Sequence, residues 1–124
     1  MDVVTFPVDG KPVLVAQDPS VPGTGGSLWD CAFAVAKYLE VRKDLVAGSN
    51  FLELGAGTGL VGLCARALGA RSTTITDLPD LLPLLSYNAA LNTDSSDSTS
   101  AVVRALDWTN PRHREEVAAL KPDL

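Results

Sequence analysis

The chain has 124 residues, of which 46% are hydrophobic and 20% charged, and its formal net charge is −5. These values are typical of one folded domain rather than a disordered chain. The acidic balance argues against nucleic acid and anionic membranes as partners, because both attract basic patches. No run reaches the roughly 18 apolar residues of a membrane helix, and the N-terminus lacks the basic flank of a signal peptide. We expect a cytoplasmic location, with the nucleus as a second candidate.

The N-terminal segment is predicted to be a β-hairpin followed by a loop. Residues 3–17 are β-prone on both sides of Asp9-Gly10, a dipeptide that favours a tight hairpin turn. Residues 18–26 are rich in glycine and proline and are expected to form the loop.

A helix is predicted to follow this loop. Ser27 is a candidate N-cap, and Asp30 three residues later completes a capping box. Trp29 and Phe33 begin a series of apolar residues at helical spacing that continues to about residue 40. One face of this helix is therefore expected to be buried.

Cysteine and histidine are scarce in the chain. Cys31 and Cys64 lie in helix-like apolar stretches and are expected to be small buried groups in a reducing compartment. His113 is the single histidine and lies in a charged stretch that we interpret as a solvated helix face. No metal-ligand spacing is present, so no metal site is expected.

Strands and helices alternate in the rest of the chain. Strands are predicted at 51–54, 73–76 and 101–106, helices at 60–68, 79–91 and 111–120, and a polar loop at 93–100. Such alternation predicts an α/β fold with a parallel sheet and right-handed crossovers. Pro83 is expected to strain or kink its helix. We divide the chain into an N-terminal hairpin and loop, 1–26, and a main domain, 27–124.

The segment between the first of these strands and its helix reads "FLELGAGTGLVGL". A phosphate-binding P-loop is excluded, because no lysine follows the glycines. A dinucleotide pattern, G-x-G-x-x-G, is present at Gly57, Gly59 and Gly62, but it begins late in the turn. The pattern that fits every position is an acid, Glu53, followed by alternate glycines from Gly55.

This pattern resembles motif I of the class I S-adenosylmethionine-dependent methyltransferases. The resemblance implies that Glu53, Gly55, Ala56 and Gly57 contribute to a site for S-adenosylmethionine. Glycines allow a sharp turn and close approach of a ligand to the backbone. In that family the acid more often orders the loop than binds the ligand amine directly, so a direct salt bridge is not predicted.

Two further residues follow later strands. Asp77 ends the second strand, where an acid can accept hydrogen bonds from both ribose hydroxyls of a nucleoside. Its alternative role is to cap the helix that begins at Pro79. Trp108 follows the third strand, where it can stack on an adenine or serve as a core or surface anchor.

Taken together, "GSLWDCAFAVAKYLE", "LELGAGTGLVGL", "TDLPDLLPLLSYNAALN" and "LDW" resemble the seven-β-strand protein-lysine methyltransferases of the methyltransferase-like 21 group. This resemblance implies a Rossmann-like class I methyltransferase sheet and a protein substrate methylated on lysine. It places Trp29 in the cofactor pocket, where the alternative is a core tryptophan, and it implies a buried structural hydrogen bond for Asn88.

Members of that group continue beyond "KPDL" with a fourth strand and substrate-binding segments. We therefore expect this chain to hold the N-terminal half of the fold, strands 1–3 with flanking helices after the hairpin. The strand at 51–54 would then be an exposed edge suited to self-association. No residue qualifies as a general base. The alternative functions are a non-catalytic cofactor-binding or interaction module and an NAD-dependent oxidoreductase.

Overall fold

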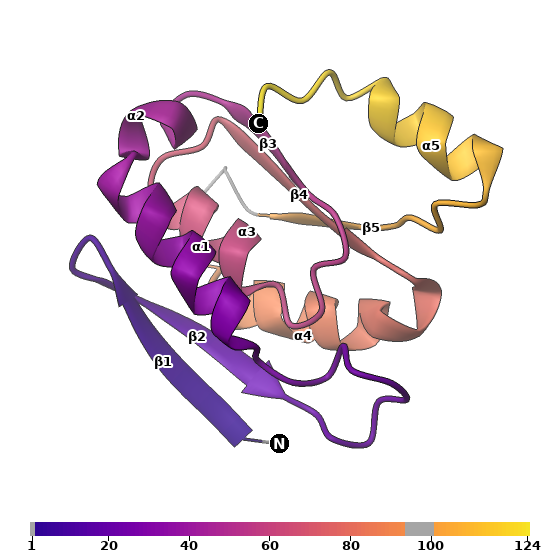
Figure 1. The fold of residues 1–124 in the computed structure, drawn as a ribbon, viewed down its shortest axis with the longest axis horizontal. Helices are drawn as coiled ribbons and strands as arrows, with labels where there is room; N and C mark the ends of the chain where they lie inside the picture. The colour runs from indigo at the N-terminus through magenta and orange to yellow at the C-terminus, as the bar shows by residue number, and fades with distance from the viewer. Residues whose placement is uncertain (1, 94–100) are drawn as a thin grey trace.

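A computed structural model describes residues 2–93 and 101–124 (Figure 1). The predicted polar loop lies almost entirely outside these residues. The elements, in chain order, are β1 (Asp2–Val8), β2 (Lys11–Gln17), α1 (Asp30–Val41), α2 (Lys43–Val46), β3 (Asn50–Glu53), α3 (Leu60–Ala67), β4 (Ser72–Asp77), a 3-10 turn η1 (Pro79–Leu81), α4 (Leu82–Leu91), β5 (Val102–Ala105) and α5 (Pro111–Ala118).

The predicted hairpin is present as the antiparallel pair β1 and β2, in which Val8 lies opposite Lys11. Asp9 and Gly10 have φ angles of 49° and 75°. Two consecutive positive φ angles match the right-handed twist of a hairpin, and Asp-Gly tolerates them well. The local sequence alone therefore accounts for this turn.

The second sheet is parallel, with strand order β3-β4-β5. This confirms the α/β fold expected from the alternation of strands and helices. Helices α3 and α4 are the crossover connections, and together with α1 they form a layer that contacts both the sheet and the hairpin (Figure 1). Within the described residues, no helix combines the length and apolarity needed to cross a bilayer.

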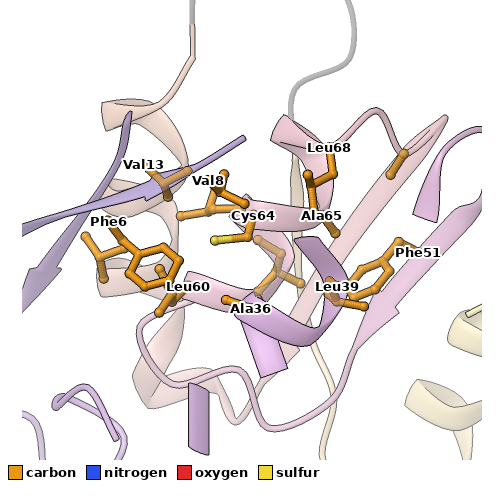
Figure 2. Close-up of a cluster of buried hydrophobic side chains, with 14 of the residues drawn as sticks. Phe6, Val8, Val13, Ala36, Leu39, Phe51, Leu60, Cys64, Ala65 and Leu68 are labelled. Atoms are coloured by element: carbon orange, nitrogen blue, oxygen red, sulfur yellow. The ribbon is translucent and has the colours of Figure 1, made fainter. Parts of the chain in front are cut away.

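The hairpin and the helices share one hydrophobic core. Figure 2 shows Val8 and Phe6 of the hairpin in the same cluster as Leu60 and Cys64 of α3 and Phe51 of β3. Leu60 and Cys64 are almost completely inaccessible to solvent. The division of the chain at residue 26 stays a prediction, but the apolar face of the hairpin packs into the core of the main domain.

The predicted N-cap of the first helix was wrong. Helix α1 begins at Asp30 with Trp29 as its N-cap, and no side chain caps it, so Ser27 is not the N-cap. The N–H of Leu28 instead donates to Gln17 Oε1 at 2.9 Å, which ties this segment to the end of β2. The predicted helix at 79–91 is divided into η1 and α4, and Pro83 lies in the first turn of α4, where its missing N–H is not needed. The strain or kink expected at Pro83 stays a prediction.

Strand β3 lies at the edge of its sheet, as expected, but that edge is partly covered. The N–H of Leu52 donates to the Leu124 carbonyl at 2.9 Å, and the N–H of Asp123 donates to the Asn50 carbonyl at 2.8 Å. Asp123 Oδ2 also accepts the Asn50 N–H at 2.8 Å. Residues 123–124 thus pair with β3 in the parallel direction, so the expectation of a wholly exposed edge is wrong. Self-association through the rest of this edge stays a prediction.

Candidate cofactor site

A cavity of about 760 Å³ opens at the carboxyl ends of β3 and β4. Ligands of open parallel sheets bind at this end, where the loops after the strands converge. The walls come from the glycine turn, the start of α1 and the loop before it. They include six of the seven residues proposed from the sequence: Trp29, Glu53, Gly55, Ala56, Gly57 and Asp77.

The backbone conformation of the turn requires the alternate glycines. Gly55, Gly57 and Gly59 have φ angles of 60°, 57° and 88°, a backbone region that other residues rarely adopt. A Cβ atom at Gly57 would also lie 3.0 Å from the carbonyl oxygen of Gly25. The loop before α1 therefore packs directly on the turn, a contact that the sequence does not reveal. The repeated glycines of "GTGG" are the only local signal for it.

Glu53 connects the end of β3 to the start of α3. Its Oε1 accepts a hydrogen bond from the Gly62 N–H at 2.9 Å. Burial raises the pKa of the Glu53 carboxyl to about 8, and the negative charge of Asp77 acts in the same direction, whereas the Gly62 hydrogen bond opposes it. The side chain thus orders the first turn of α3, and its raised pKa favours the protonated form near neutral pH.

Asp77, at the end of the neighbouring strand β4, holds the glycine turn by a hydrogen bond. Its Oδ2 accepts the Gly57 N–H at 2.8 Å, and its Oδ1 accepts the N–H of Leu78 at 2.7 Å. The turn η1 has no side-chain cap, so the alternative role of Asp77 as a helix cap is not what the structure contains. A carboxylate has about four acceptor positions. Asp77 therefore retains the capacity to accept two hydroxyl groups.

Trp108 lines a second cavity of about 280 Å³, which shares Gly55, Asp77 and Leu78 with the first. Its side chain is 63% exposed, so it is not a core anchor. A Cβ at Gly55 would lie 3.9 Å from Trp108 Cζ2, which places the indole beside the glycine turn. The seventh residue proposed from the sequence therefore lies beside Gly55 and lines a cavity together with Asp77.

Helix α5 holds the Asp107-Trp108 segment in place. His113 Nδ1 accepts the N–H of Asp107 at 3.0 Å, and Arg114 Nη1 donates to the Trp108 carbonyl at 2.7 Å. The interpretation of His113 as part of a solvated face was wrong: it is half-buried and bonded to the loop. Sequence periodicity missed this contact because the partner is a backbone group outside the helix.

Trp29 and Cys31 lie where α1 meets the larger cavity. The Trp29 side chain is 53% exposed, and its Nε1 donates to the Thr24 carbonyl at 3.0 Å. It therefore belongs to the cavity wall and not to the core. Cys31 is exposed and lines the same cavity, whereas Cys64 is buried, so the expectation that both cysteines are buried holds for Cys64 alone.

The two adjoining cavities have a definite chemical character. The smaller one offers an aromatic surface, and Asp77 at their junction offers carboxylate acceptors. The larger one is lined mainly by backbone and apolar groups. A nucleoside with free ribose hydroxyls suits this set. Asp77 does not by itself distinguish S-adenosylmethionine from a dinucleotide, because dinucleotide-binding folds use an acid at the same position. Within the described residues, no group of three or more potential ligands could hold a metal ion.

Comparisons with known proteins agree with this description. A model of the lysine methyltransferase family matches residues 8–124. Protein N-lysine methyltransferase METTL21A of Mus musculus is 37% identical over 106 residues, which are 86% of this chain and 48% of that protein. Protein-lysine methyltransferase METTL21E of Bos taurus is 40% identical over 86 residues, 68% of this chain and 29% of that protein.

A third relative, EEF1A lysine methyltransferase 3 of Xenopus tropicalis, is 37% identical over 86 residues, 69% of this chain and 37% of that protein. The chain thus spans about half the length, or less, of these relatives. All three carry names of lysine methyltransferases, and none supports the oxidoreductase alternative.

Proposed function

Because the chain belongs to the lysine methyltransferase family, we propose that its two adjoining cavities together bind S-adenosylmethionine. The observation that carries this proposal is the junction at Asp77, whose carboxylate lies between the aromatic cavity and the glycine turn. The family uses this cofactor in general. The assignment of the individual residues below is ours.

Each part of the site matches one part of the cofactor. Trp108 would hold the adenine, Asp77 would accept the ribose hydroxyls, and the turn at Gly55 to Gly57 would face the amino-acid portion. Trp29 would close the larger cavity from α1. Glu53 would order the turn through its bond to the N–H of Gly62 and not through a direct ion pair.

The reaction we propose is methyl transfer to a lysine side chain of a protein. The cofactor would supply a methyl group on a sulfonium, and the residues of this chain would orient it and exclude water. A lysine amine must lose its proton first, because its ordinary pKa is about 10.4. The described residues offer no general base for this step, so we assign to this chain the cofactor-binding part of the activity.

The test is calorimetric titration with S-adenosylhomocysteine of the wild type, Asp77→Asn and the control Asp80→Asn. Asp80 is exposed in η1, and both substitutions remove one negative charge. We expect at least a tenfold loss of affinity for Asp77→Asn and no change for Asp80→Asn. Tighter binding of a nicotinamide dinucleotide, or equal affinity of the three proteins, would refute the site.

Methyl transfer is tested separately, with a radiolabelled cofactor and a lysine-rich protein acceptor. Incorporation of label above a no-enzyme control would support catalysis by this chain. Cofactor binding without incorporation would favour the alternative function, a cofactor-binding module without catalysis.

A further inference from the structure

Asn88 of α4 is completely buried, and its amide makes three hydrogen bonds. Its Oδ1 accepts the Ala16 N–H at 2.8 Å, and its Nδ2 donates to the Ala16 carbonyl at 3.0 Å. The same Nδ2 donates to the carbonyl of Thr58 at 2.8 Å. Ala16 belongs to β2 of the hairpin and Thr58 to the glycine turn. One side chain therefore joins two segments that are 42 residues apart in the sequence.

Asn92, four residues after Asn88, makes a similar pair of hydrogen bonds to β2 but does not reach the glycine turn. Its Oδ1 accepts the Leu14 N–H at 2.9 Å, and its Nδ2 donates to the Leu14 carbonyl at 2.7 Å. Its second donor goes to the Asn88 carbonyl at 2.8 Å. The two amides thus satisfy the edge of β2 that β1 does not pair with, as a third strand would. Asn88 is more deeply buried than Asn92, and of the two side chains only Asn88 bonds to the glycine turn.

The bond to Thr58 lies beside the bond that Asp77 makes. Thr58 is 3% exposed and follows Gly57, whose N–H is held by Asp77. Two consecutive residues of the turn are therefore held from different sides, by a carboxylate from β4 and an amide from α4. Without the Asn88 donor, the buried carbonyl of Thr58 would lose this hydrogen bond and gain none in its place. The glycine turn would then populate other conformations.

From this arrangement we infer that Asn88 is a positioning residue for the cofactor turn, and that it couples attachment of the N-terminal hairpin to cofactor affinity. The inference rests on the proposed function. The coupling to affinity follows because the apparent affinity for the cofactor is proportional to the fraction of molecules in which the glycine turn has its binding conformation. Asn92 stabilises the hairpin in the same way but has no such link to the turn.

The test compares Asn88→Ala with Asn92→Ala by thermal unfolding and by titration with S-adenosylhomocysteine, at a temperature where both are folded. We expect both variants to lower the melting temperature. Asn88→Ala should also weaken binding at least fivefold, and Asn92→Ala less than twofold. Equal affinity of folded Asn88→Ala and wild type, or equal weakening by both variants, would overturn the inference.

A measurement on the wild type covers the case in which Asn88→Ala does not fold. Hydrogen exchange is followed at the Ala16 and Leu14 amides, with and without S-adenosylhomocysteine. We expect the ligand to slow exchange at Ala16 more than at Leu14, and equal effects at both would count against the coupling. If the folded wild type binds no S-adenosylhomocysteine, the proposed function fails first, together with the inference that depends on it.

Discussion

The carboxylate of Asp77 accepts a hydrogen bond from the backbone N–H of Gly57 at 2.8 Å, although the two residues are 20 positions apart in the sequence. The bond joins the end of β4 to the turn that follows β3. Parallel strands bring their carboxyl ends to the same edge of a sheet, which makes this contact possible. This hydrogen bond therefore fixes the glycine turn against the end of β4 at the candidate site.

Gly57→Ala should reduce both stability and cofactor binding. Its φ of 57° costs a side chain about 1–2 kcal/mol, and the new Cβ would lie 3.0 Å from the Gly25 carbonyl oxygen. Gly48→Ala is the matched control, because Gly48 has a φ of 74° with no atom within 4 Å of its Cβ position. Urea unfolding should show a larger loss for Gly57→Ala. A loss no larger than that of Gly48→Ala would show that the packing of the loop on the turn is unimportant.

Glu53→Gln should change how stability depends on pH. The pKa of the Glu53 carboxyl is about 8 in the folded protein, above its ordinary value of 4.5, so the folded state holds an extra proton between these pH values. The contribution of this group to stability is therefore complete below pH 4.5 and is lost as the pH rises through 8. Each pKa unit corresponds to about 1.4 kcal/mol.

The free energy of unfolding, measured by urea at pH 5 and pH 9, checks this prediction. Glu53→Gln should gain stability relative to wild type at pH 9, because the glutamine never acquires the buried charge. Glu115→Gln, at an exposed position of α5, is the control and should follow the wild type. If wild type and Glu53→Gln lose stability equally between the two pH values, the buried carboxyl is not responsible.

Trp108→Ala should weaken cofactor binding with little effect on stability. The side chain is 63% exposed, and such surface substitutions usually change stability by no more than about 0.5 kcal/mol. Since the chain has two tryptophans, a Trp29→Phe background leaves Trp108 as the only indole. Its fluorescence should be quenched when S-adenosylhomocysteine is added. Unchanged fluorescence under saturating ligand would place the adenine elsewhere.

His113→Leu should weaken cofactor binding by loosening the Asp107-Trp108 segment, and His113→Asn should restore part of the loss. The imidazole Nδ1 accepts the Asp107 N–H, and an asparagine oxygen is the closest replacement for this acceptor. Titration with S-adenosylhomocysteine measures both variants. Equal binding by His113→Leu and wild type would mean that α5 does not position the second cavity.

The sequence by itself determined the elements whose causes are local. The Asp9-Gly10 turn forms because both residues tolerate positive φ, and the alternate glycines from Gly55 to Gly59 are required by the backbone of the turn. The alternation of strands and helices was enough to predict the parallel sheet. Six of the seven proposed cofactor residues could be named from the glycine motif and the strand ends, whereas Trp29 was named from the family resemblance alone.

Only the tertiary structure decided the features that depend on contacts between distant segments. Examples are the start of α1 at Asp30, the pairing of Leu124 with β3, the bond from His113 to Asp107 and the bridge made by Asn88. In the last three cases a backbone N–H or C=O finds its partner outside its own helix or strand, six residues away for Asp107 and 30 residues away for Thr58. Buried backbone groups must be satisfied, but periodicity and propensity carry no information about which distant group satisfies them.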